Sequence, residues 1–141
     1  MKNNVLAKEA DAGWPMGLAQ RETGELIIAD YIFNIIWEID SDGILHRIAG
    51  TGMPGYSGDG GLAIDAELSG CHDLIIDNQG DILFSDLNNG VYRKIDSESG
   101  IITTFAGSGV VGRKGEGGLA VKAEMDCHCG IAVSPEGDIY I

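Results

Sequence analysis

One sequence unit occurs three times along the chain at an almost constant spacing. Residues 24–28 read GELII, and the pattern returns as GDILF at residues 80–84 and as GDIYI at residues 137–141. The second copy follows the first by 56 residues, and the third follows the second by 57. A fixed period is typical of repeat architectures, in which one unit cannot bury its apolar face alone and neighbouring units must stack. The repeat therefore limits this chain to folds built from stacked copies of one small unit.

Four strand-like runs separated by turn signals make up the best-preserved unit. The runs are residues 74–77, 82–86, 91–96 and 101–106. They are rich in β-branched, aliphatic and aromatic residues, which favour strands, and the segments between them are rich in Asn, Ser and Gly, which favour tight turns. Four short strands joined by tight turns predict an antiparallel meander. Meanders repeated at this period predict an all-β fold made of β-propeller blades.

Glycine-rich links connect the units, at residues 52–61 and 107–118. The segment at 119–125 has apolar residues at spacings typical of an amphipathic helix, and it predicts a short helical turn before the next blade. G-x-G-x-x-G, the pattern of a dinucleotide-binding loop, occurs at residues 50–55 and 107–112. Such a loop requires a helix directly after it, whereas further glycines follow here. We therefore expect inter-blade links at these positions and no nucleotide cofactor.

These motifs resemble those of the NHL-repeat family, in its variant with a long link. The resemblance rests on GDILFSD at residues 80–86, VYRKID at 91–96, GIITTFAG at 100–107 and the link GMPGYSGDGG at 52–61, and it extends over about residues 6–141. It implies a radial β-propeller whose loop-lined faces bind a protein or a small-molecule ligand. Some similar propellers are lyases or lactonases with a metal ion in the channel. The resemblance therefore also implies an alternative function, a metal-dependent hydrolase or lyase with its site at the channel mouth.

The repeats divide the chain into two full units and part of a third, at about residues 6–61, 62–118 and 119–141. We therefore expect one propeller segment over residues 1–141, with two complete four-stranded blades and one half blade. Propellers close with typically four to eight blades, so we expect an incomplete ring whose missing blades come from a longer chain. A segment of this kind exposes unpaired strand edges, and we expect it to be poorly soluble or oligomeric on its own.

The charge balance narrows the class of partners. The chain has 22 acidic and 9 basic residues, for a formal net charge of −13 at pH 7. Nucleic acids and anionic membrane surfaces require basic patches, so we expect neither as a partner. No apolar run reaches the roughly 20 residues of a membrane-spanning helix, and the N-terminal sequence MKNNV contains no apolar signal core. Three cysteines cannot all pair within one chain, which favours a reducing compartment without assigning one.

Sulfur and imidazole side chains gather just before the innermost strand of each unit. When the copies are aligned by their period, residues 14–17 (WPMG) fall beside residues 70–73 (GCHD) and 127–130 (CHCG). One aligned position holds Met16, His72 and Cys129. The position just before it holds Pro15, Cys71 and His128. Residues of equal phase lie at equal radius in a propeller, so we expect each set to converge near the mouth of the central channel.

This gathering has two interpretations. Thiolate, imidazole and thioether groups are ligands of zinc and of other borderline or soft metals. The candidate metal ligands are Met16, Cys71, His72, Cys127, His128 and Cys129, and Asp73 is a candidate catalytic base. The other interpretation is plain packing, because Cys and Met are common fillers of crowded strands and no C-x-x-C pair occurs. We favour packing as the role of these side chains over binding of zinc or another divalent metal. With it we favour a propeller that binds a protein or a ligand over an enzyme.

Overall fold

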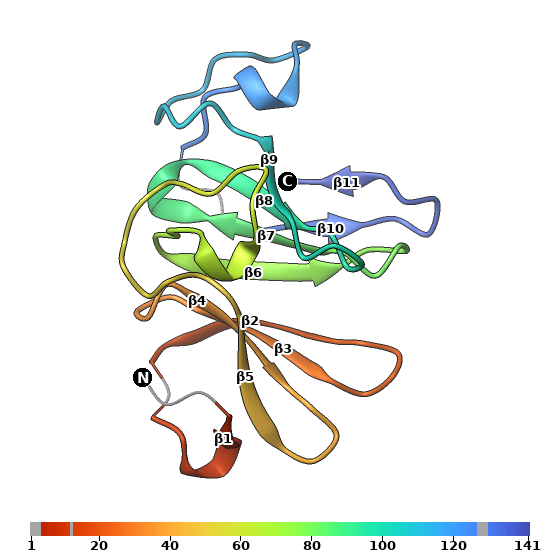
Figure 1. Ribbon diagram of the computed structural model, residues 1–141. Helices are drawn as coiled ribbons and strands as arrows, with labels where there is room; N and C mark the ends of the chain where they lie inside the picture. The colour runs from red at the N-terminus through yellow and green to blue at the C-terminus, as the bar shows by residue number, and fades with distance from the viewer. Residues whose placement is uncertain (1–3, 12, 127–129) are drawn as a thin grey trace.

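The computed structural model describes residues 4–11, 13–126 and 130–141, and most of its regular structure is β-strand (Figure 1). Within these residues the strands form antiparallel sheets of five, four and two strands, in the orders β1-β5-β4-β3-β2, β6-β7-β8-β9 and β10-β11. The strands are β1 (Val5–Leu6), β2 (Pro15–Gln20), β3 (Leu26–Asp30), β4 (Ile35–Ile39), β5 (Ile44–Ala49), β6 (Cys71–Ile76), β7 (Ile82–Asp86), β8 (Val91–Ile95), β9 (Ile102–Ala106), β10 (Ala132–Val133) and β11 (Ile139–Tyr140). The 3-10 helices of the described residues are η1 (Ala7–Glu9), η2 (Ala63–Asp65), η3 (Leu87–Asn89) and η4 (Ala120–Lys122). None of the helices in this part of the chain has the length and apolar content needed to cross a membrane.

The second sheet is the meander that the sequence predicts. β7 coincides with the predicted run, and β8 and β9 agree with theirs to within one residue. β6 begins at Cys71 rather than at Leu74, and its pairing with β7 shows a register shift between these two residues. Because the first sheet repeats the same strand order with one added strand at its outer edge, the predicted architecture of four-stranded blades is confirmed.

A helical turn does form within residues 119–125, but it is shorter than predicted: it is the three-residue 3-10 helix η4. The carbonyl groups of Ala120 and Ala123, which an α-helix would offer to amides four residues ahead, accept the N–H groups of Gly107 and Ser108 at 2.9 and 2.8 Å. The link therefore stays extended on either side of one short turn, because its carbonyl groups bond to the preceding blade.

The two complete blades pack against each other through one apolar core. Its buried residues come from the first blade, the link and the second blade: Ile27, Ala29, Ile36, Ala49, Ala63, Ala66, Leu68, Cys71, Leu74, Ile82, Phe84, Ile95 and Ile102. The inner strands β2 and β6 approach closely at Gly17, where a Cβ would lie 2.6 Å from the carbonyl oxygen of His72. Only glycine allows two backbones to come so near. A smaller core joins the second blade to the third unit through Tyr92 and Ile131.

The link between the blades bonds to both of them through its backbone. Ala63 accepts the N–H of Gly50 from the first blade at 2.9 Å, and it donates its own N–H to the carbonyl of Gly100 in the second blade at 2.9 Å. The equivalent bonds in the other copies run from Gly107 to Ala120 and from Ala7 to Gly43. The segment that contains β1 and η1 therefore lies on β5 as the link lies on β9, which gives the first sheet its fifth strand. Residues 52–61 of the link are referred to below as the long link.

Candidate functional site

Three ring side chains meet where the chain enters the innermost strands of the two complete blades. Trp14 precedes β2, Tyr31 follows β3, and His72 is the second residue of β6. The rings of Trp14 and Tyr31 are stacked, with centroids 6.4 Å apart and 22° between their planes. The ring of His72 meets that of Tyr31 edge-on, at 6.3 Å and 89°. These three residues are referred to as the aromatic row.

The aromatic row combines an open apolar surface with a ring nitrogen that has no partner. Trp14 is 62% exposed, and Met16, two residues later in β2, is 47% exposed. Nδ1 of His72 is buried and makes no hydrogen bond with any described residue. A stacking surface beside one unsatisfied polar atom is the combination that orients a small ligand.

Asp30, the last residue of β3, fixes the position of Trp14. Its carboxylate is almost fully buried and accepts the N–H groups of Gly13 at 3.1 Å, Trp14 at 3.3 Å and Phe33 at 3.0 Å. The carbonyl group of Trp14 accepts the N–H of Tyr31 at 3.0 Å. The first two members of the aromatic row are therefore held beside each other by backbone bonds.

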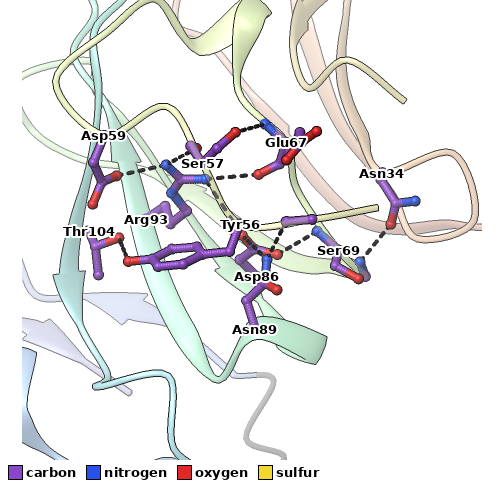
Figure 2. A network of polar contacts seen from close by, with 12 residues as sticks. Asn34, Tyr56, Ser57, Asp59, Glu67, Ser69, Asp86, Asn89, Arg93 and Thr104 are labelled. Atoms are coloured by element: carbon purple, nitrogen blue, oxygen red, sulfur yellow. Dashed lines mark hydrogen bonds and ion pairs between the residues drawn. The ribbon is translucent and has the colours of Figure 1, made fainter. Parts of the chain in front are cut away.

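Asp86 occupies the same position in the second blade, 56 residues after Asp30. Its carboxylate is 0% exposed and accepts the N–H of Ser69 at 2.7 Å and the side-chain amide of Asn89 at 2.9 Å (Figure 2). Burial raises the pKa of Asp86 to about 6, against the lowering effect of these hydrogen bonds and of the Arg93 charge. The segment that leads into β6 is thus tied to a buried carboxylate of its own blade.

The residue after Ser69 ties the same segment to the first blade. Gly70 donates its N–H to the side-chain oxygen of Asn34 at 2.8 Å (Figure 2). Asn34 has a left-handed backbone with a φ of 54°, a conformation that Asn tolerates better than most residues. His72 therefore follows a stretch of backbone that both blades hold.

A buried arginine pins the long link over the second blade (Figure 2). Arg93, in β8, is 0% exposed, and its Nη2 donates to the carbonyl of Ser57 at 2.8 Å and to the carboxylate of Asp59 at 2.7 Å. Its guanidinium carbon lies 5.3 Å from the ring centroid of Tyr56, a favourable cation–π contact. Its Nη1 lies 3.7 Å from Asp86. These contacts join the long link to the carboxylate that holds the entry to β6.

Neither the aromatic row nor the Arg93 contacts follow from the sequence motifs. The row escapes alignment by period, because the positions equivalent to Trp14 carry Gly70 and Cys127. The burial of Arg93 could have been predicted from the sequence, because strand alternation places its side chain on the same face as that of Val91. A buried arginine requires polar or charged partners.

The predicted metal ligands fall only in part within the described residues. Cys71 is fully buried in the core between the blades. Burial, followed by the nearby carboxylates of Asp86 and Asp30, raises the pKa of its thiol well above the ordinary value. Three other candidate ligands, Cys127, His128 and Cys129, lie outside the described residues. Among the described residues no group of three or more His, Cys, Asp or Glu side chains is placed to hold a metal ion, so a shared metal site stays a prediction.

Asp73, the candidate catalytic base, has both carboxylate oxygens engaged. They accept the N–H groups of Leu74 at 3.0 Å and Ile131 at 3.3 Å. The backbone N–H of Asp73 donates to the hydroxyl of Ser85 at 3.0 Å. Since Ile131 belongs to the third unit, Asp73 ties the second blade to its neighbour, and a catalytic role stays a prediction.

A hollow of about 460 Å³ lies at the other end of the inner strands, between the hairpin turns at 20–23 and 76–80. Arg21 donates from Nη1 to the carbonyl of Gly80 at 3.0 Å and pairs with Glu38 at 3.2 Å. The two turns are thus tied together beside the cavity.

No protein-family model and no curated protein sequence matches this chain. Solved structures do match. Virginiamycin B lyase from Staphylococcus aureus has a TM-score of 0.62 at 18% identity, over 97% of this chain and 36% of its own. A protein of unknown function from Bacteroides thetaiotaomicron has a TM-score of 0.68 at 21% identity, over 77% of this chain and 27% of its own. A streptogramin B lyase has a TM-score of 0.55 at 19% identity, over 97% of this chain and 42% of its own.

These neighbours share radially arranged antiparallel blades with the chain. The fold is a β-propeller. The chain spans 27% to 42% of the length of these structures, and its blades form an incomplete ring. The inner strands of a propeller surround a central channel. The aromatic row and the cavity between the hairpin turns lie at opposite ends of β2 and β6.

Proposed function

We propose that this chain is part of an NHL-like propeller that binds a ligand at the channel mouth, on the aromatic row. The observation that carries the proposal is the exposed stack of Trp14 and Tyr31 beside Nδ1 of His72, which has no partner among the described residues. The NHL-like motifs at residues 80–86 and 91–96 support the family assignment. A small molecule or a side chain of a protein partner can occupy such a site.

The aromatic row suits a ligand with a flat apolar face and one polar group. An aromatic pair contributes roughly 0.5–1.5 kcal/mol beyond the area that it buries, and Trp14 has surface available for such a contact. Nδ1 of His72 donates or accepts one hydrogen bond according to its tautomer, which would orient the ligand. The formal charge of −13 disfavours a polyanionic ligand.

A binding titration tests this proposal. Quinupristin is a suitable first probe, because a catalytically inactive virginiamycin B lyase from Staphylococcus aureus, a fold neighbour at 18% identity with a TM-score of 0.61, has been solved with it. A set of planar heteroaromatic fragments completes the panel. Binding is read from the indole N–H signal of Trp14 in NMR spectra, and from calorimetry for the variants.

We expect Trp14→Ala and Tyr31→Ala to abolish binding. Met53→Ala is the matched control, because Met53 is 65% exposed on the long link and should not affect binding. If every variant binds alike, or if no compound moves the Trp14 signal, the aromatic row is not the ligand site.

The alternative function, a metal-dependent hydrolase or lyase at the same mouth, is supported by one observation. Nδ1 of His72 has no hydrogen-bond partner among the described residues, so it could bind a metal; the candidate ligands His128 and Cys129 lie outside the described residues. Zinc or another divalent metal held there would polarise a carbonyl group or activate water, and Asp73 would then accept a proton. Cys71 does not fit such a site, because its side chain is fully buried in the apolar core between the blades.

Metal analysis distinguishes the two functions. The protein is loaded with zinc, passed through a desalting column and measured by mass spectrometry. His72→Ala should lose a bound metal that His46→Ala retains, since His46 bonds to Asp40 and Asn4 instead. A wild-type chain that holds no metal above background contradicts the enzyme alternative.

A further inference from the structure

We propose that Asp86 is a positioning residue of the channel mouth: it fixes the backbone that leads into His72 and couples that backbone to the long link. The ligand consequences of this proposal rest on the function proposed above. The positioning role rests on the geometry of the second blade and is testable without a ligand.

The first part of the geometry is the bond from Ser69 to Asp86. At 2.7 Å it is a short, charge-assisted hydrogen bond, of the kind that is about twice as strong as a neutral one. If the carboxylate were lost, a partly buried amide would be left without its acceptor, which is costly because the amide would be desolvated and unpaired. Ser69 is followed by Gly70 and then by the first residue of β6, so a shift at Ser69 is passed directly to His72.

The second part connects Asp86 to the long link. The side-chain amide of Asn89 donates both to Asp86 at 2.9 Å and to the carbonyl of Gly55 at 2.7 Å (Figure 2). An amide nitrogen carries two hydrogens, so both bonds can form at once. Arg93 provides a second connection, because it contacts Asp86 and also holds Asp59 on the long link.

The hydrogen bond from the segment before the inner strand to a buried aspartate occurs in both complete blades. Gly13, which is 56 residues before Ser69, donates its N–H to Asp30 just as Ser69 donates to Asp86. Each carboxylate therefore holds the entry to an inner strand, and with it one end of the aromatic row. In contrast to Asp30, Asp86 also faces the two side chains that lead to the long link.

Protonation of Asp86 would disturb this arrangement. The N–H of Ser69 and the amide of Asn89 direct hydrogens towards the carboxylate, and the positive charge of Arg93 lies 3.7 Å from it, so an added acid proton would face a donor or a cation. The charged or titratable groups that face Asp86 from neighbouring elements are Arg93 of β8, Asp59 of the long link and Cys71 of β6. Burial raises the pKa of Asp86 to about 6, which places the range of the test in mildly acidic conditions; the positioning role itself rests on the bonds of Ser69 and Asn89.

The test follows the backbone amide signals of the whole chain by NMR from pH 5 to pH 8. The Ser69 signal should move with a midpoint near pH 6, because its N–H bonds to the titrating carboxylate. This step should disappear in Asp86→Asn. It should remain in Asp96→Asn, the matched control, whose carboxylate bonds to Ser99 in the same blade. A step that persists in Asp86→Asn, or its absence from the wild type, overturns the proposal.

The imidazole of His72 lies three residues after Ser69. The variant His72→Gln removes this ring and serves as a second control. Positioning by Asp86 predicts that the Ser69 step is unchanged in His72→Gln, and loss of the step there would overturn the proposal. The wild-type and His72→Gln titrations remain decisive even if Asp86→Asn does not fold.

The position of the His72 ring provides a readout that a merely structural role would not move. Tyr31 meets this ring edge-on, so its ring current displaces the His72 carbon-bound proton signals. Asp86→Asn should move these signals towards those of a free histidine while the far-UV circular dichroism spectrum is unchanged. Unmoved His72 signals in a folded Asp86→Asn variant contradict the positioning role.

A ligand-binding experiment distinguishes an error in the proposed binding site from an error in the proposed role of Asp86. A compound that binds the aromatic row should lose about tenfold in affinity in Asp86→Asn at pH 7.5, the size of one displaced hydrogen bond. Equal affinity for the wild type and Asp86→Asn overturns the positioning and leaves the binding site intact. If no compound binds, the proposed function fails, and the Ser69 and His72 signals still decide the role of Asp86.

Discussion

At the scale of single residues, Arg93 and Arg113 differ sharply in what they contribute. The side chain of Arg93 is 0% exposed and pairs with Asp59 and Asp86, whereas that of Arg113 is 82% exposed and pairs with Asp126. Removing one partner of a buried pair leaves an uncompensated charge and costs about 3–5 kcal/mol. An exposed pair contributes only about 0–1 kcal/mol.

We therefore expect Arg93→Ala to lower the free energy of unfolding by about 3 kcal/mol or more. Arg113→Ala, the control, should change it by less than about 1 kcal/mol. Urea denaturation at pH 7 measures both values. Similar losses in the two variants would mean that the buried network contributes nothing beyond an ordinary surface pair.

Asp86 and Asp96 make the stability of the chain depend on pH in opposite directions. Burial raises the pKa of Asp86 from 3.8 to about 6, so the folded chain binds this proton more tightly than the unfolded chain. The contribution of Asp86 to stability therefore grows as pH falls from about 6 towards 4, by at most roughly 3 kcal/mol at about 1.4 kcal/mol per unit of pKa. The hydroxyl of Ser99 lowers the pKa of Asp96 below its ordinary value of 3.8, so the contribution of Asp96 to stability is lost only as pH falls below about 4.

Comparing unfolding at pH 7.5 and pH 5 tests the effect of Asp86. Between pH 7.5 and pH 5, protonation of Asp86 should raise the free energy of unfolding of the wild type. Asp86→Asn should lack this increase, because an amide does not titrate. Asp96→Asn should retain that gain. The same pH dependence in the wild type and in Asp86→Asn would show that the buried carboxylate is not protonated in this range.

At the scale of elements, the contact between the inner strands depends on Gly17. A Cβ there would lie 2.6 Å from the carbonyl oxygen of His72 and 2.9 Å from the amide nitrogen of Leu74. Gly130 holds the equivalent position in the third unit, and a Cβ there would meet no described residue within 4 Å.

We expect Gly17→Ala to lower the free energy of unfolding by about 1–3 kcal/mol, because it overpacks the contact between β2 and β6. Gly130→Ala should have little effect. Thermal unfolding followed by circular dichroism compares the two variants. An unchanged Tm for Gly17→Ala would mean that the inner strands are free to separate.

The positions of most strands were predictable from the sequence because the signals are local. Alternating apolar residues and Asn or Gly turns define β7 and β8 without reference to the rest of the chain. β1 has no such signal: it is two residues long and forms because Ile44 and Leu45 lie beside it. The helical turn near Ala120 is shorter than expected for a related reason, since carbonyl groups of this segment bond to a preceding blade that local patterns do not contain.

The aromatic row was predictable only in part. Alignment by period marks Met16 and His72 because both carry unusual side chains at one repeated position. The contacts of Trp14 with Tyr31 and of Tyr31 with His72 arise from the folding of β2 against β3 and from the packing of the second blade on the first. Alignment of the repeats cannot reveal such contacts, because they join positions that are not equivalent.

At the scale of the whole molecule, the first blade has an open apolar flank. Leu18 is 59% exposed on β2, whereas Leu74, its equivalent on β6, is 3% exposed because the first blade covers it. A hollow of about 100 Å³ on the first blade is lined by apolar side chains that include Ile28, Trp37 and Leu45. Apolar surface of this kind favours association.

We expect the purified chain to self-associate through this flank. Sedimentation velocity should detect species larger than a single chain, and Leu18→Glu should shift the distribution towards the monomer. Leu62→Glu, at a residue of the link that is 52% exposed, serves as the control for added charge. A wild-type chain that sediments as a monomer and unfolds cooperatively would contradict this expectation.

The bonds that the link makes to both neighbouring blades explain how such a molecule can tolerate mutation. They are made by backbone groups, so Asp65 in one link and Lys122 at the equivalent place in the next, with opposite charges, are both compatible with them. A change in length within the link would misplace these bonds, but the one-residue difference between the first two units lies in an exposed turn, four residues at 40–43 against five at 96–100. Repeats of this kind can therefore differ in sequence as long as insertions fall in turns.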